Sequence, residues 1–295
     1  MNNYDDLITG TSAEYNGRTR LSKEDYAAKK RSEREAVFAL SDRTAMDVAK
    51  DGGRLRQYLD VQGRVDRYSA VNALLVMAQR ADATRLETFE GWKRLGAFVK
   101  PGQVAISVLE PYEYTKGDGT PGVGYNVKKV FDINQVDARR VNVTSPLNYS
   151  ERQLLKALVF NAPVRIIGVD DLPDGLGAMT DPDTGEISVR RGMEFTDIFR
   201  SIARELAFAS LTACPSTQAD PHFSAYCASY LLCRKHGVDT KDFSFAEAPG
   251  LLNGMDAREV KGELSQIRDV AEEISGRMAK QLDAANRAAQ LREAR

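Results

Sequence analysis

The chain has 295 residues, of which 41 are basic and 42 are acidic, so its formal net charge is −1. This balance excludes a uniformly basic protein that coats nucleic acid and excludes a long acidic tail, but it is compatible with a local basic surface. Hydrophobic residues make up 42% of the chain. That fraction is ordinary for a globular protein of about two domains whose core needs no disulfide or metal staple.

Cysteine usage and the N-terminal residues indicate the compartment. Three cysteines are too few for a disulfide framework, so we expect a reducing environment. The first ten residues, MNNYDDLITG, lack the basic and apolar regions of a signal peptide, and no segment approaches the roughly 18 apolar residues of a membrane span. We therefore expect a soluble, cytoplasmic protein with no membrane partner. Residues 1–20 are polar and predict a flexible leader.

Helices followed by a β-hairpin are predicted for the first half of the chain. Ser22 with Asp25 is typical of a helix start, and the run Asp51-Gly52-Gly53 interrupts the helical pattern. After Pro101-Gly102 the apolar residues alternate as in a strand, beginning at Val104. The predicted elements are a helix over 21–49, a short helical or turn segment over 54–60, helices over 69–79 and 89–95, and strands over 104–108 and 127–131.

Short strands between helices are predicted for the second half. The turn sequence from Asp181 to Gly185 separates two strands, and Gly237 is typical of a helix end. Apolar residues at steps of three or four predict a long amphipathic helix or a helix pair at the C-terminus. The predicted elements are helices over 150–161, 196–212, 224–236 and 257–294, and strands over 165–169, 177–180 and 187–190. The two halves together predict an α+β fold.

Aromatic and basic side chains are mixed in one part of the first half. Aromatic rings stack on unpaired bases while Lys and Arg neutralise phosphates, so the mixture is compatible with binding of single-stranded nucleic acid. The alternative is that Trp92 and Phe131 belong to the core and that the cations form a solvated surface. The candidate binding residues are Arg64, Arg67, Tyr68, Asn72, Trp92, Lys93, Arg94 and Lys100.

Four short motifs occur in a fixed order in this region. They are YSxxN at 68–72, GWxxLG at 91–96, VxxG at 99–102 and VFDxxQ at 130–135. In this order they resemble the N-terminal domain of the ArdC-like antirestriction proteins, which LtrC-like proteins of plasmids and conjugative elements share. The resemblance covers about residues 22–140. It implies a single-stranded-DNA-binding domain over residues 21–142, with the candidate residues at the DNA.

A second group of candidate residues lies on the helix predicted over 196–212. In the ArdC-like family a zincin-like metallopeptidase domain follows, whose HExxH helix binds zinc through two histidines while the glutamate activates a water molecule. The resemblance puts Arg204 and Phe208 at the histidine positions, Glu205 at the glutamate and Tyr226 at the third ligand.

A guanidinium repels a metal ion and a phenyl ring has no donor atom. The resemblance therefore implies a degenerate zincin-like domain over residues 143–295, a pseudo-metallopeptidase without catalytic residues, metal or cofactor. The alternative is a plain buried helix in which Arg204 and Glu205 make polar contacts.

Other residues that could bind a metal are His222, Cys227, Cys233 and His236. Cys227 and Cys233 are six residues apart, which separates them by about 120° around a helix and is a poor geometry for one metal. We therefore expect buried, inert thiols there.

These features favour a single-stranded-DNA-binding accessory protein of a mobile genetic element, related to antirestriction or conjugation, with a catalytically dead zincin-like domain. Two alternatives stay open. One is a protein-binding scaffold that uses the degenerate cleft or the long C-terminal helix. The other is a metal-dependent hydrolase that uses Glu205 with an unrecognised set of ligands. Single-stranded DNA is the expected partner, and a protein bound by the C-terminal domain is a second.

Overall fold

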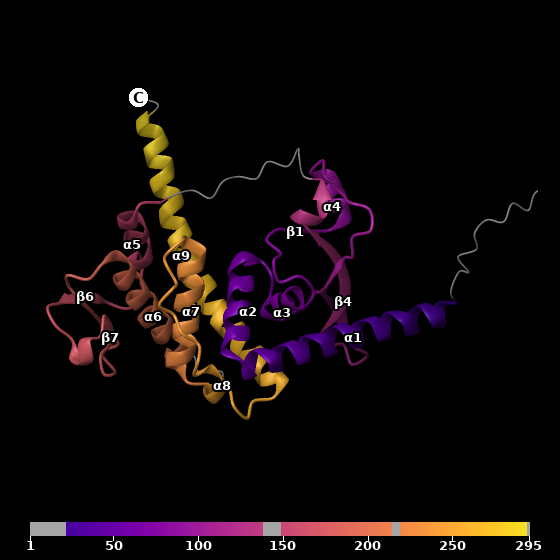
Figure 1. The fold of residues 1–295 in the computed structure, drawn as a ribbon, viewed down its shortest axis with the longest axis horizontal. Helices are drawn as coiled ribbons and strands as arrows, with labels where there is room; N and C mark the ends of the chain where they lie inside the picture. Colours follow the sequence, from indigo (N-terminus) through magenta and orange to yellow (C-terminus); the bar gives the residue numbers. More distant parts are fainter. Residues whose placement is uncertain (1–21, 138–148, 214–218, 294–295) are drawn as a thin grey trace, which may run out of the picture.

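A computed structural model describes residues 22–137, 149–213 and 219–293. Helices form its centre, and small sheets lie on two sides of them (Figure 1). This arrangement confirms the predicted α+β fold. The leader predicted over residues 1–20 and the domain boundary predicted at residue 142 both fall outside the described residues.

The first helices each begin at a side chain that caps them. The Ser22 hydroxyl accepts a hydrogen bond from the Asp25 N–H at 3.0 Å. Asp51 ends one helix and caps the next, because its carboxylate accepts from the Arg54 N–H at 2.7 Å. The segment predicted over 54–60 is therefore a full helix. These helices are α1 (Lys23–Lys50), α2 (Gly52–Arg64) and α3 (Ala70–Gln79).

A three-stranded antiparallel sheet follows, in the order β1-β4-β3. Its hairpin confirms the predicted one, but the strand expected from Val104 begins only at Ile106, and Val104 is exposed. A small lobe lies at one end of the sheet, where α4 packs beside the β2–β5 pair. The elements are β1 (Leu86–Glu87), α4 (Phe89–Arg94), β2 (Phe98–Val99), β3 (Ile106–Thr115), β4 (Pro121–Asp132) and β5 (Val136–Asp137).

The second half begins with a helix and a sheet in the order β6-β8-β7, in which β6 runs parallel and β7 antiparallel to β8. The C-terminal segment is one continuous helix, which decides between the helix and the helix pair left open by the sequence. The elements are α5 (Glu151–Val159), β6 (Ile166–Val169), β7 (Ala178–Thr180), β8 (Ile187–Arg190), α6 (Phe195–Ala213), α7 (Pro221–His236), α8 (Ala248–Leu251) and α9 (Ala257–Glu293).

One apolar core joins helices from both halves of the chain. It contains Leu59 of α2, Leu232 of α7 and Ile267 of α9, all fully or almost fully buried. Ion pairs also connect the two halves, including Asp60 with Arg234 at 2.9 Å. We call this contact between the two halves the seam. Burial of apolar surface between α2 and α7 therefore contributes to the stability of both halves. None of the helices in the described ranges is long and apolar enough to span a bilayer.

Candidate functional site

A cavity of about 870 Å³ opens between the edge strand β7, helices α6 and α7, and the segment 244–251. Arg204, Glu205 and Phe208 reach it from α6, and Tyr226 reaches it from α7. The structure thus brings together the four positions that the sequence resemblance assigned to a degenerate metal site.

Both carboxylate oxygens of Glu205 contact other residues of the protein at this cavity. Its side chain is buried, with the residue only 5% exposed. One carboxylate oxygen accepts hydrogen bonds from the Thr180 N–H at 3.0 Å and from the Thr180 hydroxyl at 2.8 Å. The other oxygen lies 3.1 Å from Nε of Arg204. Glu205 therefore ties α6 to the edge strand β7, and its charge is balanced by Arg204.

The other two positions are also engaged in contacts within the protein. The ring of Phe208 stacks on His222, with 4.2 Å between centroids and 12° between planes. The Tyr226 hydroxyl accepts a hydrogen bond from the Ser244 N–H at 2.8 Å, and its ring contacts Phe243. The first contact joins α6 to the start of α7, and the contacts of Tyr226 fix the wall of the cavity formed by the segment after α7.

The residues in this cavity do not fit a catalytic metal ion. Arg204 carries a permanent positive charge, and Phe208 offers no lone pair. Both oxygens of Glu205 already have partners. Across the described ranges, no cluster of three or more His, Cys, Asp or Glu side chains has the arrangement of a metal site. We therefore derive no metal-dependent step for this cavity.

The thiols on α7 lie in the core. Cys227 and Cys233 are both fully buried. Burial raises the pKa of Cys227 well above its ordinary value and raises the pKa of Cys233 to about 12. Their thiol form is therefore favoured at neutral pH, and it is a poor nucleophile and metal ligand.

Two of the predicted DNA-binding residues have internal structural roles. The amide of Asn72 donates to the Leu109 carbonyl at 2.9 Å and accepts from the Leu109 N–H at 2.8 Å, which fixes α3 to β3. Trp92 is fully buried, and its Nε1 donates to the Phe131 carbonyl at 2.8 Å. In these positions the Trp92 ring has no face open for stacking on a base.

Arg64 and Tyr68 are also partly engaged. The guanidinium of Arg64 donates to the carbonyls of Ala81 and Ala83, which ties the end of α2 to the loop before β1. Tyr68 is half-buried, and its pKa is raised by burial and, to a smaller extent, by the nearby Glu87 charge. Arg67 is exposed, and no partner for it is found among the residues that the structure describes.

The remaining candidates lie in the lobe formed by residues 89–100, which we call the α4–β2 lobe. Lys93 and Arg94 are exposed at the end of α4, and within the described chain neither has an ion-pair partner. Lys100 is exposed and donates to the Asn134 carbonyl at 3.1 Å. Three cations thus reach solvent from one small lobe.

Sequence reasoning missed two exposed aromatic residues in the same lobe. Phe89 is 51% exposed and Phe98 is 62% exposed. Phe89 and Lys93 are four residues apart on α4, so they share one face of the helix. Trp92, three residues from Phe89, also has a same-face spacing, so the sequence alone does not show which of the two rings is accessible.

The family-like motifs build the support of this lobe. Asp132 is fully buried and its carboxylate accepts from the N–H groups of Thr84 at 2.7 Å and Arg85 at 3.1 Å. The Gln135 amide donates to the Val104 carbonyl at 2.7 Å. The guanidinium of Arg85 lies 5.6 Å from the Trp92 ring centroid. These contacts position α4 and β2, and with them the exposed cations.

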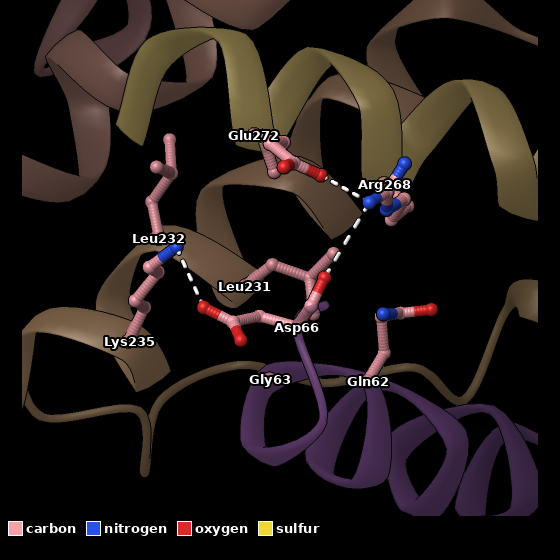
Figure 2. Close-up of a pocket in the computed structure, with 9 residues that line it drawn as sticks. Gln62, Gly63, Asp66, Leu231, Leu232, Lys235, Arg268 and Glu272 are labelled. Atoms are coloured by element: carbon pink, nitrogen blue, oxygen red, sulfur yellow. Dashed lines mark hydrogen bonds and ion pairs between the residues drawn. The ribbon is translucent and has the colours of Figure 1, made fainter. Parts of the chain in front are cut away.

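A smaller cavity lies at the junction of α2, α7 and α9, as Figure 2 shows. Asp66 pairs with Lys235 at 2.9 Å, and its carbonyl accepts from Arg268, which also pairs with Glu272. The volume of about 30 Å³ is near that of one water molecule. It is too small for an organic ligand, so we interpret this feature as part of the seam between the two halves.

Comparison with known proteins identifies a shared fold. No family model and no curated protein matches the sequence. The structure is similar to the metal-free crystal structure of the antirestriction protein ArdC from plasmid R388, with 14% identity and a TM-score of 0.50 over 72% of this chain and 86% of that one. The Mn(II)-bound crystal structure of the same protein gives 16% identity and a TM-score of 0.51, over 72% and 85% of the chains. The ArdC-like fold predicted from the motifs is therefore confirmed.

Proposed function

We propose that this protein is an antirestriction-related protein of a mobile genetic element that binds single-stranded DNA through the α4–β2 lobe. The observation that carries the proposal is the group of exposed cations beside exposed Phe89 and Phe98. The shared fold supports it, since the neighbour is an antirestriction protein from a plasmid. Binding alone would shield an incoming strand, so the proposal requires no chemistry.

The lobe offers both interactions that a single strand requires. Lys93, Arg94 and Lys100 supply positive charge for phosphates, whose neutralisation releases counterions. Phe89 and Phe98 supply apolar rings on which unpaired bases stack with little regard to sequence. A duplex offers no unstacked base, so we expect a preference for single strands.

The test compares two pairs of charge-removing substitutions in the full chain. Lys93→Ala with Arg94→Ala removes two cations of the lobe, while Arg152→Ala with Lys156→Ala removes two exposed cations of α5 as a matched control. Fluorescence anisotropy with a labelled 25-nucleotide oligothymidine measures affinity at several salt concentrations.

We expect the lobe variant to bind several-fold more weakly and to lower the salt slope by about 1.4, since each lost single-strand phosphate contact removes about 0.7. The α5 variant should bind as the unaltered protein does. Equal binding by all three proteins would contradict the location of the site.

We further propose that the cavity beside Glu205 has no metallopeptidase activity. The ion pair with Arg204 and the two hydrogen bonds from Thr180 support this, because they stabilise the charged carboxylate of Glu205 and so make it a weaker base toward water. Elemental analysis of protein purified without chelators should find far less than one zinc or manganese per chain. About one metal per chain, lost in Glu205→Gln, would instead support the hydrolase alternative.

Binding of a protein partner in this cavity is a second candidate function. The cavity stays open, and exposed Met179 and Leu251 line it. Leu251→Arg would place a charge on this apolar wall. A partner that co-purifies with the unaltered protein and is lost in this variant, while DNA binding is kept, would support the scaffold alternative.

A further inference from the structure

Two tyrosines of β3 lie directly opposite two glycines of β4. Tyr112 pairs with Gly124 and Tyr114 pairs with Gly122 in the antiparallel register. Residues two apart on a strand point to the same side, so both rings are on one face of the hairpin. This part of the hairpin extends beyond the core, and the residues from Glu110 to Pro121 are exposed.

The glycines make room for the rings. A Cβ atom at Gly124 would lie 2.4 Å from Cζ of Tyr112, and one at Gly122 would lie 2.8 Å from Cζ of Tyr114. Neither glycine has a positive φ, so glycine is needed here for space and not for backbone conformation. Each ring therefore lies across the backbone of the opposite strand.

The outer sides of both rings remain open. Tyr112 is 40% exposed and Tyr114 is 46% exposed. The ring centroids are 6.1 Å apart, with 44° between the ring planes. We call these two rings, with the glycines beneath them, the tyrosine platform.

The hairpin that carries the platform is well fixed at both ends. At the turn, the Lys116 N–H donates to the Thr120 carbonyl at 2.8 Å, and Asp118 accepts from Thr120. Toward the base, Tyr125 packs edge-on against Phe38 of α1. Because the rings are held before any ligand arrives, little conformational entropy is lost when one binds.

The neighbours on the same face favour a nucleic acid over a protein. The accessible neighbours on β3 and β4 are polar or charged, namely Glu110, Asn126 and Lys128, with Lys128 paired to Glu110, while Val108 opposite Lys128 is buried. Lys116 follows at the turn. The two rings are thus the apolar part of a polar face, unlike the continuous apolar patch of a protein-docking surface. Exposed aromatic rings on the surface of a sheet are typical of sheets that stack unpaired bases.

We infer that the tyrosine platform stacks bases of the single-stranded DNA whose backbone the α4–β2 lobe binds, an inference that rests on the proposed function. Gly124 and Gly122 lie eight and ten residues before Asp132, where β4 reaches the lobe (Figure 1). At about 3.3 Å per residue this is roughly 26–33 Å. At about 3.4 Å per nucleotide, a strand whose bases stay stacked spans this distance with about eight to ten nucleotides, and an extended strand needs fewer.

The experiment removes the aromatic rings and keeps the fold. Tyr112→Leu with Tyr114→Leu in the full chain is compared with Tyr112→Phe with Tyr114→Phe, which keeps the rings. Tyr26→Leu is the control, since Tyr26 is an exposed tyrosine on α1 away from the hairpin. Anisotropy with the 25-nucleotide oligothymidine measures affinity, and circular dichroism checks the fold.

The leucine variant should bind about tenfold or more weakly, because stacking on an aromatic ring stabilises each bound base substantially. Its salt slope should be unchanged, since no phosphate contact is lost. The phenylalanine variant and Tyr26→Leu should bind within about twofold of the unaltered protein. A three-nucleotide oligothymidine is too short to reach both sites even when extended, and it should lose less affinity than the long one in the leucine variant.

Two results would contradict base stacking on the tyrosine platform without contradicting the proposed function. One is a leucine variant that binds the long oligonucleotide normally while the Lys93 and Arg94 variant does not. The other is normal DNA binding with loss of self-association by light scattering, which would identify the rings as a contact between two copies of the chain. Absence of binding by the unaltered protein would instead contradict the proposed function itself.

Discussion

Arg204 and Glu205 form an ion pair, so removal of Arg204 should lower the stability of the protein by leaving the buried Glu205 carboxylate without its counter-charge. In Arg204→Met the buried Glu205 carboxylate loses its counter-charge and keeps only the hydrogen bonds from Thr180. We expect a loss of about 1.5–3 kcal/mol in the free energy of unfolding. The double variant Arg204→Met with Glu205→Gln should recover part of it. Urea denaturation measures both, and equal stability of the single variant and the unaltered protein would contradict the role given to the pair.

Asn72 belongs to the fold and is not expected to touch DNA. Asn72→Ala leaves the buried N–H and carbonyl of Leu109 without partners, at a cost of about 1–3 kcal/mol for each group. Gln79 is the matched control, because it makes the same two hydrogen bonds to Ser107 at an exposed position, where water can replace them. Urea denaturation should show a much smaller loss for Gln79→Ala. If Asn72→Ala keeps its stability but loses DNA binding, Asn72 is a contact residue after all.

At the scale of elements, the helix starts could be predicted because their signals are local. Ser22 and Ser69 cap helices with side chains that reach only three residues along the chain. The direction in which Trp92 points could not be predicted, because it is decided by a hydrogen bond to Phe131, 39 residues away. The same holds for Glu205, whose partner Thr180 is 25 residues away.

The motif residues that could be recognised from the sequence are largely buried residues that hold the first half together, including the support of the α4–β2 lobe. Asn72, Trp92 and Asp132 are all buried and hydrogen-bonded within the protein. The side chains with open surfaces, Phe89 and Phe98, are identified only when the packing of the lobe is known. The tyrosine platform required the register of the hairpin, which sequence alternation does not fix.

The end of α7 should make stability depend on pH through His236. Burial, with a smaller effect of the Lys235 charge, lowers the pKa of His236 to about 4. The unfolded chain takes up this proton near pH 6.5, so the unfolded state binds more protons between these values and stability falls as pH falls through that range. The contribution is on the order of 3 kcal/mol by pH 4.

Urea denaturation of the unaltered protein and of His236→Leu between pH 7.5 and 4.5 measures this dependence. Below pH 6.5, the free energy of unfolding should depend on pH less steeply in the variant than in the unaltered protein, by about 1.4 kcal/mol per pH unit. Parallel pH profiles for the two proteins would show that His236 titrates normally in the folded state.

At the scale of the whole molecule, the seam between the two halves should make unfolding cooperative. Apolar residues of α2 and α7 share one core, and the ion pairs Asp42–Lys261 and Asp66–Lys235 cross it. We therefore expect a single calorimetric transition with equal van't Hoff and calorimetric enthalpies. Two resolved transitions would favour independent units divided at residue 142, which stays a prediction.

The proposed binding of DNA would also involve the whole molecule, since the α4–β2 lobe and the tyrosine platform lie at different points along strand β4. With a net charge of −1 the protein has no general attraction to phosphates. Any affinity for DNA must therefore come from a local surface, and stacking on its rings requires bases that are unpaired.

The most direct test measures binding of the unaltered full chain to a 25-nucleotide single strand and to the matching duplex, over a series of salt concentrations. We expect tight binding of the single strand at low salt, a linear fall of log affinity with log salt concentration, and much weaker binding of the duplex. No detectable binding of the single strand at low salt, or a preference for the duplex, would contradict the account.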